Sequence, residues 1–233
     1  MRTIGILGGM SWESTVFYYQ HINQLVKNAR GGLTSAPMMI DSVDFAQMAQ
    51  WQREGHWDLA AQYLGERARV LQNAGCQAIG IATNTMHKVA PAIESAVKIP
   101  LLHIADPTAA AIRKAGLSRI GLLGTRFTME QDFYKQRLSE RHGIDVVVPN
   151  EMERDVVHRV IYEELCLGQI HPDSRAAYRR IMQRLVEQEG VQAIILGCTE
   201  ISLLVDHSDA SVPLFDTTAL HAQAAAAFGL AMK

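Results

Sequence analysis

The feature of this sequence that most limits its possible folds is an internal repeat. Four short matches recur in the same order at offsets of 116, 116, 115 and 113 residues (120 minus 4 for the first): residues 4–8 with 120–124, 17–20 with 133–136, 77–79 with 192–194, and 99–102 with 212–215. One such match is common in α/β proteins, but an ordered series at nearly constant spacing indicates duplication. The sequence therefore predicts two halves of like fold, joined near residues 115–118.

Short apolar runs alternate with longer amphipathic segments along both halves. The runs that predict buried strands are residues 3–7, 37–43, 78–82, 101–104, 120–123, 145–148 and 193–196. The segments whose apolar residues recur every three or four positions, and which predict helices, are residues 12–29, 58–72, 129–141 and 174–188. Alternation of this kind is typical of parallel sheets covered by helices on both faces.

We therefore predict an α/β protein with two pseudosymmetric domains, residues 1–115 and 116–233. Each domain is expected to be a mostly parallel sheet flanked by helices, with the active site in the cleft between them. The C-terminal helix belongs to the second domain in sequence, and this prediction allows it to pack on the first domain.

Charge and hydropathy exclude several classes of function. The 233 residues carry a net charge of −2, and the sequence pI is about 6.5. Neither value suits a nucleic-acid-binding or lipid-binding protein. The apolar runs fall short of the ~20 residues that cross a bilayer, and the N-terminus lacks signal-peptide architecture. We expect a small-molecule substrate, with neither nucleic acid nor membrane as a partner.

Cysteine and histidine usage argues against a disulfide framework and a metal centre. The three cysteines, Cys76, Cys166 and Cys198, show no CxxC spacing, and the nine histidines form no HExxH or HxH cluster. We therefore expect no metal and a reducing, cytoplasmic location.

The repeat places two protic side chains at equivalent strand ends. The third predicted strand of the first half leads into Thr83, and its counterpart leads into Cys198, at an offset of 115 (198 minus 83). Ligands of open α/β sheets bind at the carboxyl ends of the strands. If the halves face one another about a pseudo-twofold axis, one group can remove an α-proton while the other returns a proton from the opposite side. The pattern favours inversion at a carbon atom.

Each member of this pair also has a structural interpretation. A thiol titrates at about 8.5, and a helix N-terminus can lower that value to ~7, so Cys198 is expected to act as a base ahead of a short helix capped by Thr199 or Ser202. The alternative is a buried structural cysteine. A threonine hydroxyl is a poor base, so Thr83 is expected to relay or donate a proton. The alternative is a strand-end hydroxyl bonded to the backbone.

Two further turns are candidates for binding a carboxylate. Residues 8–11 (GGMS) follow the first strand, and backbone N–H groups in such a turn can hold an anion. They match neither the phosphate-binding loop nor the dinucleotide fingerprint, and a tight strand-to-helix turn is the alternative. In the second half, Thr125 and Arg126 occupy the equivalent place, and Arg126 is otherwise a solvated side chain.

Residues 4–14 (IGILGGMSWES), 84–88 (NTMHK) and 196–201 (LGCTEI) resemble motifs of the aspartate/glutamate racemase superfamily. The resemblance extends over essentially the whole chain. It is greatest for the branch of aspartate racemases and enterobacterial aspartate/glutamate or broad-specificity amino-acid racemases. It implies a pseudosymmetric, PLP-independent enzyme without a cofactor, usually a homodimer, that deprotonates and reprotonates Cα of an amino acid.

The resemblance also implies roles for single residues. Most members carry a cysteine at both motif positions, whereas this chain has Thr83 and Cys198. The second cysteine serves the L-enantiomer in the family, so L-to-D conversion is the better supported direction. The residues that match substrate contacts are Met10, Gln52, Asn84, Thr85, Cys166 and Thr199. Gln52 and Cys166 stand where basic side chains are common, so we expect aspartate or glutamate with a looser substrate range.

Two other functions remain open from the sequence. One is a one-thiol reaction on the same scaffold, such as decarboxylation of a malonate or isomerisation of maleate, because a single cysteine opposite a threonine suits it. The other is a catalytically inactive protein that binds an amino acid. Exchange of the α-proton with solvent distinguishes the racemase from both.

Overall fold

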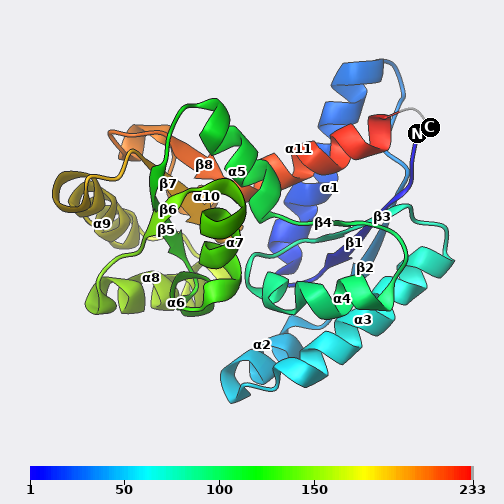
Figure 1. Ribbon diagram of the computed structural model, residues 1–233, viewed down its shortest axis with the longest axis horizontal. Helices are drawn as coiled ribbons and strands as arrows, with labels where there is room; N and C mark the ends of the chain where they lie inside the picture. Colours follow the sequence, from blue (N-terminus) through cyan, green and yellow to red (C-terminus); the bar gives the residue numbers. More distant parts are fainter. Residues whose placement is uncertain (232–233) are drawn as a thin grey trace. The chain divides into compact units, whose positions relative to one another are not determined.

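Two parallel sheets form the framework of the computed structural model, which describes residues 1–231 (Figure 1). The first sheet has the order β2-β1-β3-β4 and the second the order β6-β5-β7-β8, with four strands in each. The strands are β1 Ile4–Gly8, β2 Met38–Ser42, β3 Ala78–Ile81, β4 Leu101–Leu102, β5 Arg119–Gly124, β6 Asp145–Val147, β7 Ala193–Gly197 and β8 Leu214–Asp216. The predicted α/β class and the predicted strands are confirmed, and β8 lies in the last segment of the repeat.

The two sheets are also equivalent in their hydrogen bonding at the start of the central strands. The side chain of Gln77 accepts from the Thr3 N–H at 3.3 Å, just ahead of β1. The side chain of Gln192, its counterpart in the repeat, accepts from the N–H groups of Ser118 and Arg119 at 2.8 and 3.0 Å, at the start of β5. The sequence repeat is therefore a repeat of structure.

Helices connect the strands in the predicted alternation. They are α1 Trp12–Arg30, α2 Phe45–Glu54, α3 Trp57–Asn73, α4 Ala90–Ala96, α5 Ala105–Lys114, α6 Arg126–Glu130, α7 Asp132–His142, α8 Glu151–Glu163, α9 Pro172–Glu189, α10 Ile201–Leu204 and α11 Thr217–Leu230, with single 3-10 turns η1 Thr85–Val89, η2 Leu165–Leu167 and η3 His207–Asp209. Within residues 1–231, none of the helices has the length and apolar character needed to cross a bilayer.

The helix predicted over residues 129–141 is wrong as a continuous element. Gln131 is extended, with φ of −85° and ψ of 154°, and separates α6 from α7. Met129 of α6 is buried in a core cluster with Leu123, whereas Tyr134 and Leu138 of α7 are buried outside that cluster. Apolar periodicity alone does not reveal that the two segments pack against different neighbours.

Alternation along β1 divides the first core between the two faces of its sheet. Ile4 and Ile6 are buried against α1 and α11, where they join Tyr18 in one cluster. Leu7 points to the other face and joins the cluster that contains Leu64 of α3. Strand side chains alternate between faces, so a parallel strand buried on both sides is apolar throughout.

The contacts divide the chain into two compact units that exchange their last helices. The first unit contains Met1–Ile104 and the segment that begins at His221, and the second contains Ala105–Leu220. The boundary thus precedes α5, whereas the repeat suggested a division after residue 115. α5 follows β4 in sequence but packs on α7, where Asp106 forms an ion pair with Arg137. α11 follows β8, yet its body packs on α1 (Figure 1).

The buried contact between α11 and α1 should be measurable as stability. Tyr18 is fully buried, and its hydroxyl lies 2.8 Å from Nδ1 of His221. Because His221 Nε2 lies 2.6 Å from Leu102 O, we expect Nε2–H to donate to that carbonyl and Nδ1 to accept from Tyr18. Removing the hydroxyl leaves a buried acceptor without its donor. Tyr18→Phe should therefore lower the free energy of unfolding by about 1–3 kcal/mol.

Urea unfolding monitored by circular dichroism checks this value. The matched control is Tyr19→Phe in the same helix, whose side chain is largely exposed. That change should stay within about 0.5 kcal/mol of the parent protein. Equal effects of the two substitutions would contradict the structural role of the Tyr18–His221 contact.

Candidate active site

The turn after β1 uses its first N–H group internally. The Gly9 N–H donates to Thr15 Oγ1 at 2.8 Å. Gly9 has φ of +88°, and a Cβ atom there would lie 2.3 Å from Val43 O, so only glycine fits. The Gly9 N–H is therefore not available to a ligand, because a threonine hydroxyl already occupies it, and the anion site expected over residues 8–11 stays a prediction for the other N–H groups. The side chain of Met10 is buried in the core, which leaves its backbone as the part available to a ligand.

A histidine holds the end of β3 against the end of β4. His87 Nδ1 lies 2.8 Å from Thr83 O, and the Ile104 N–H donates to His87 Nε2 at 3.2 Å. Both contacts are satisfied by one neutral tautomer, with the proton on Nδ1. The ring of His87 also stacks edge-on against His103 at 4.4 Å between centroids. Thr83 itself is half-buried, and His87 anchors its backbone carbonyl.

The residues that follow Thr83 turn inward. Asn84 and Thr85 are both buried at the start of η1. Gln52, in α2, is 3% exposed, and its amide Nε2 donates to Met86 Sδ at 3.0 Å. This contact places Gln52 beside Met86 in the turn that follows β3, and its role as a substrate contact stays a prediction. Near the end of β3, the first unit thus has the amide groups of Gln52 and Asn84 and the hydroxyl group of Thr85.

In the second unit, the end of β7 carries a thiol that faces a carboxylate. Cys198 is 9% exposed, and its Sγ donates to Glu200 Oε2 at 2.9 Å. The hydroxyl of Thr199 donates to the same oxygen at 2.7 Å. Glu200 is 2% exposed. Two protons therefore converge on one buried carboxylate oxygen.

This surrounding raises the pKa of Cys198 well above its usual range, first because burial disfavours the thiolate and second because the Glu200 carboxylate repels it. The expectation of a thiol with a pKa lowered by a helix N-terminus is therefore wrong. α10 spans only Ile201–Leu204, and no side chain caps it. The hydroxyl of Thr199 donates to Glu200, and that of Ser202 donates to Thr199 O. The predicted caps thus have other partners.

Two other predicted contacts lie in the same unit. Thr125 is buried and caps α6 by accepting from the Thr128 N–H at 3.3 Å. Arg126 is half-exposed and pairs with Asp155, which is the solvated alternative for this residue. Cys166, in η2, is partly buried and packs against the core cluster that contains Cys198.

The basic side chains near these strand ends have partners of their own. Arg67 forms an ion pair with Asp41 near the end of β2, with Nη2 and Oδ2 2.6 Å apart. Lys88, in η1, lies 3.8 Å above the ring of Trp57. Within residues 1–231, no group of three or more His, Cys, Asp and Glu side chains is arranged to hold a metal ion.

The sequence-predicted residues thus gather in two groups. Met10, Gln52, Thr83, Asn84 and Thr85 belong to the first unit, and Thr125, Cys166, Cys198 and Thr199 belong to the second. Sequence reasoning missed Glu200 as a partner of the thiol and His87 as the anchor of Thr83. An acidic residue two positions after a candidate nucleophile was the available signal for Glu200.

Comparison with known proteins reveals similarity along the whole chain. The model of the Asp/Glu/Hydantoin racemase family matches residues 7–225. The broad specificity amino-acid racemase RacX of Bacillus subtilis (strain 168) is 25% identical over 221 residues, which are 93% of each protein.

Two solved structures support the same similarity. A Yersinia pestis protein assigned to the Asp/Glu racemases is 57% identical, with a TM-score of 0.92, over 99% of this chain and 100% of that one. An aspartate racemase homologue from Pyrococcus horikoshii OT3 is 33% identical, with a TM-score of 0.85, over 98% and 99%.

The raised pKa of Cys198 predicts a specific pattern of reactivity in the substrate-free protein. Only the thiolate reacts with iodoacetamide, so alkylation of Cys198 should be slow at pH 7 and should rise about tenfold per pH unit up to pH 9. Mass spectrometry of the Cys198 peptide against time measures this rate separately from Cys76 and Cys166. A rate that already levels off near pH 7 would contradict the effect of burial and of Glu200.

Proposed function

Because the chain belongs to the Asp/Glu/hydantoin racemase family, we propose that it inverts the α-carbon of an amino acid without a cofactor, with Cys198 and Thr83 acting on opposite faces. It is an enzyme of the isomerase class, an amino-acid racemase. The observation that carries the pairing is the structural repeat. Thr83 follows β3 and Cys198 follows β7, and these strands pair with β1 and β5 in equivalent ways.

Cys198 takes the α-proton of the L-enantiomer in this proposal. Its thiolate is a stronger base than any form of Thr83 available near neutral pH. The Thr83 hydroxyl then supplies a proton to the opposite face, directly or through water. This asymmetry favours the L-to-D direction at the deprotonation step, because removal of the α-proton from the D-enantiomer would require the Thr83 hydroxyl to act as the base.

The remaining polar groups stabilise the charge that forms when Cα loses its proton. That charge spreads onto the α-carboxylate as in an enediolate, and fixed hydrogen-bond donors stabilise it more in the transition state than in the bound substrate. We assign this role to Asn84 and Thr85 in the first unit and to Thr199 in the second. Thr125 and the backbone at Met10 are further contacts to the carboxylate.

We propose aspartate and glutamate as the first substrates, with limited discrimination against other amino acids. The amide of Gln52 and the thiol of Cys166 are neutral groups for the distal carboxylate. Arg67, Arg126 and Lys88 are held by Asp41, Asp155 and Trp57. A neutral donor contributes less than a charged one to binding a carboxylate. Amino acids with uncharged side chains therefore lose less binding energy relative to aspartate and glutamate than they would at a site with a basic residue. The similarity to a broad specificity racemase supports this range.

Exchange of the α-proton in deuterium oxide tests the assignment. Loss of the α-proton signal of L-aspartate, L-glutamate and neutral L-amino acids is followed by NMR, and the enantiomer ratio by chiral chromatography. Cys198→Ala should slow exchange from the L side by about 10²–10⁴-fold, because a general base of the proposed kind contributes that much. Thr83→Cys should accelerate exchange of the D-enantiomer about tenfold or more.

Results that differ from these expected rates identify which part of the proposal is wrong. An unchanged D-side rate in Thr83→Cys would remove Thr83 as a proton carrier. Release of CO2 from a malonate without exchange at Cα would favour the one-thiol decarboxylase, and binding of an amino acid without exchange would favour the inactive binding protein.

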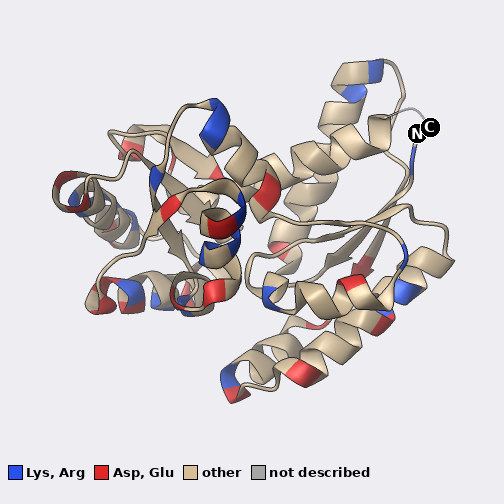
Figure 2. Ribbon diagram, viewed as in Figure 1, with Lys and Arg blue, Asp and Glu red and all other residues tan. Residues whose placement is uncertain are grey.

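We also propose that the protein is a homodimer that associates through the exposed face of α1. Trp12, Val16 and Tyr19 recur at helical spacing and are 64%, 42% and 53% exposed, beside the buried side that includes Tyr18 and Ile22. An apolar surface that extends beyond the buried side of a helix indicates a second partner. Figure 2 shows charge on α1 only toward its ends. A second copy of the chain suits this uncharged surface, because a twofold contact pairs like with like.

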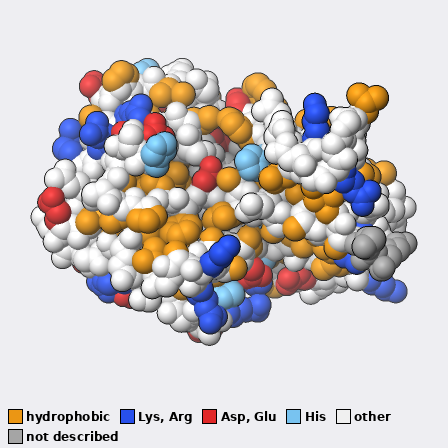
Figure 3. Space-filling view, turned by 90° about the horizontal axis from the view of Figure 1, so that it is seen from above, with side chains coloured by type: hydrophobic (Ala, Val, Ile, Leu, Met, Phe, Trp, Pro, Cys, Tyr) orange, Lys and Arg blue, Asp and Glu red, His pale blue; other side chains and the backbone are white. Residues whose placement is uncertain are grey.

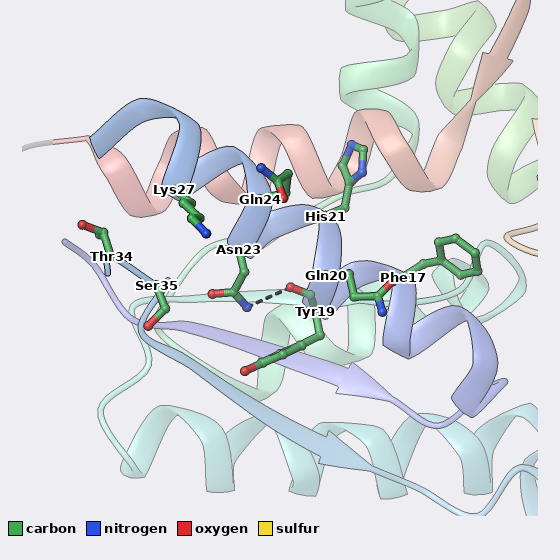
Figure 4. A pocket seen from close by; sticks show the side chains of 9 residues that line it. All are labelled: Phe17, Tyr19, Gln20, His21, Asn23, Gln24, Lys27, Thr34 and Ser35. Atoms are coloured by element: carbon green, nitrogen blue, oxygen red, sulfur yellow. Dashed lines mark hydrogen bonds between the residues drawn. The ribbon is translucent and has the colours of Figure 1, made fainter. Parts of the chain in front are cut away.

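The neighbouring surface is consistent with such a contact. A groove lined by Phe17, Tyr19 and Lys27, among others, runs along α1 beside the segment that enters β2 (Figure 4). Asn23 fixes that segment to α1, since its Oδ1 accepts from the Ala36 N–H at 2.9 Å. Ile40 of the edge strand β2 is half-exposed. Hydrophobic side chains also reach the surface of the first unit in the view from above (Figure 3).

Charge placed on this face should separate the dimer. Val16→Arg and Tyr19→Arg should convert the species measured by sedimentation velocity from twice the chain mass to a single chain of 25.8 kDa, because an arginine at the contact is desolvated without a partner. Met152→Arg, at a 78% exposed position of α8, is the matched control and should remain dimeric. A monomeric parent protein, or dimers in every variant, would contradict the proposal.

We place the enzyme in the cytoplasm. None of Cys76, Cys166 and Cys198 forms a disulfide, and a reducing compartment would keep Cys198 as the thiol that the proposed chemistry uses.

A further inference from the structure

The buried carboxylate beside Cys198 poses a question that the proposed racemisation leaves open. A base must lose its own proton before it can take one from the substrate. The pKa of the Cys198 thiol is raised, so release of its proton to water near neutral pH is unfavourable. It would also leave a thiolate 2.9 Å from the carboxylate of Glu200, with two negative charges in a buried place.

Transfer of the proton over this short contact avoids the second charge. The Sγ–H of Cys198 already points at Glu200 Oε2. When the proton moves, the S–H bond breaks, an O–H bond forms on Oε2, and the pair keeps a total charge of −1. The other titratable groups that face the thiol are Cys166 of η2 and Tyr178 of α9. The pKa of Tyr178 is raised by burial, so its hydroxyl stays neutral and donates to Val157 O at 3.0 Å. Glu200 is thus the acceptor in hydrogen-bond contact.

We propose that Glu200 accepts the thiol proton of Cys198, and that Thr199 permits this transfer only when a substrate carboxylate is bound. The inference rests on the proposed racemase function, because it assigns a second role to Thr199, one of the proposed carboxylate contacts. It adds a proton acceptor for the thiol of Cys198 and a substrate-dependent control of the base.

The control of the Cys198 base by substrate follows from the single proton of the Thr199 hydroxyl. Without substrate, Thr199 Oγ1 donates to Glu200 Oε2 at 2.7 Å, and a hydrogen bond to a carboxylate stabilises its charged form. A hydroxyl has one O–H donor, so Thr199 must leave Oε2 when it donates to the carboxylate of a bound amino acid. The oxygen then has one donor fewer and takes the thiol proton. The thiol stays protonated until a substrate is present.

Protons and electrons balance over the whole reaction. Cys198 passes its proton to Glu200, and the thiolate then takes the α-proton, so the S–H bond reforms and the C–H electron pair delocalises into the substrate carboxylate. Thr83 gives its hydroxyl proton to the opposite face of Cα. At that point Glu200 holds one extra proton and Thr83 lacks one. After the product leaves, Glu200 releases its proton to water and Thr83 takes one from water.

Two readouts on the intact protein test the proposal. The first is the pH profile of kcat/KM for exchange of the L-α-proton. In the parent protein the rate should be nearly constant from pH 7 to 9, because the proton moves inside the pair. In Glu200→Gln the thiol must ionise into water, so the rate should rise about tenfold per pH unit from pH 7 to 9, although loss of the Glu200 charge makes this ionisation easier. A profile in Glu200→Gln that matches the parent would overturn the role of Glu200.

The second readout needs no substrate and no racemase activity. Iodoacetamide alkylation of Cys198, followed by mass spectrometry at pH 7, should be at least about tenfold faster in Thr199→Val, because the competing donor to Glu200 is gone. Thr199→Ser keeps the hydroxyl and should react like the parent. Ser202→Ala, which removes a hydroxyl donated to Thr199 O instead of Glu200, is the matched control and should also react like the parent.

Equal alkylation rates in Thr199→Val and the parent would overturn the control by Thr199. Circular dichroism of each variant shows whether it folds, and Thr199→Ser and Ser202→Ala keep the comparison within the same turn. If no amino acid exchanges its α-proton in the parent protein, the racemase proposal fails, whereas the alkylation rates still report the pairing of Cys198, Thr199 and Glu200.

Discussion

The close approach of two backbones at the end of the second sheet is the constraint on which the candidate site depends. A Cβ atom on Gly124 would lie 2.9 Å from Gly197 O, and one on Gly197 would lie 2.8 Å from Leu123 O. Neither position tolerates a side chain without moving β5 away from β7. This contact brings the next residue of each strand, Thr125 and Cys198, to one edge of the sheet. Gly124, which matches Gly8 in the sequence repeat, and Gly197 are therefore the residues that position the chemistry.

Exchange of the last helices gives each unit a core that its own repeat does not encode. The body of α11 packs on β1 and α1 of the first unit, and α5 packs on α7 of the second. Each unit thus completes its core with a helix that follows the last strand of the other half. Equivalent positions remain recognisable, since Tyr18 and Tyr134 match in the repeat and are both fully buried. The exchange makes the folding of either half depend on the other.

The electrostatics of the thiol changes how this protein can use a cysteine. A base with a pKa lowered by a helix dipole would be ready at all times. Cys198 instead lies in a buried setting next to an acid, which keeps the thiol protonated and protects it from reaction with solvent molecules. Thr83, the other proposed proton carrier, has its carbonyl held by the imidazole of His87. A protected thiol favours reaction with a bound substrate over side reactions.

Local patterns in the sequence determined the secondary structure and the class of fold. Alternating apolar runs and amphipathic segments predicted the strands, and the ordered matches predicted two like sheets, because strand burial and helix amphipathicity are properties of neighbouring residues. The break at Gln131, the exchange of α5 and α11, the Thr15 hydroxyl on the Gly9 N–H and the carboxylate beside Cys198 were decided by tertiary structure. Each of these features depends on which segments of the chain come into contact after folding. Burial and charge at one atom are sums over such neighbours, so the sequence located the thiol and only the folded chain determined its chemistry.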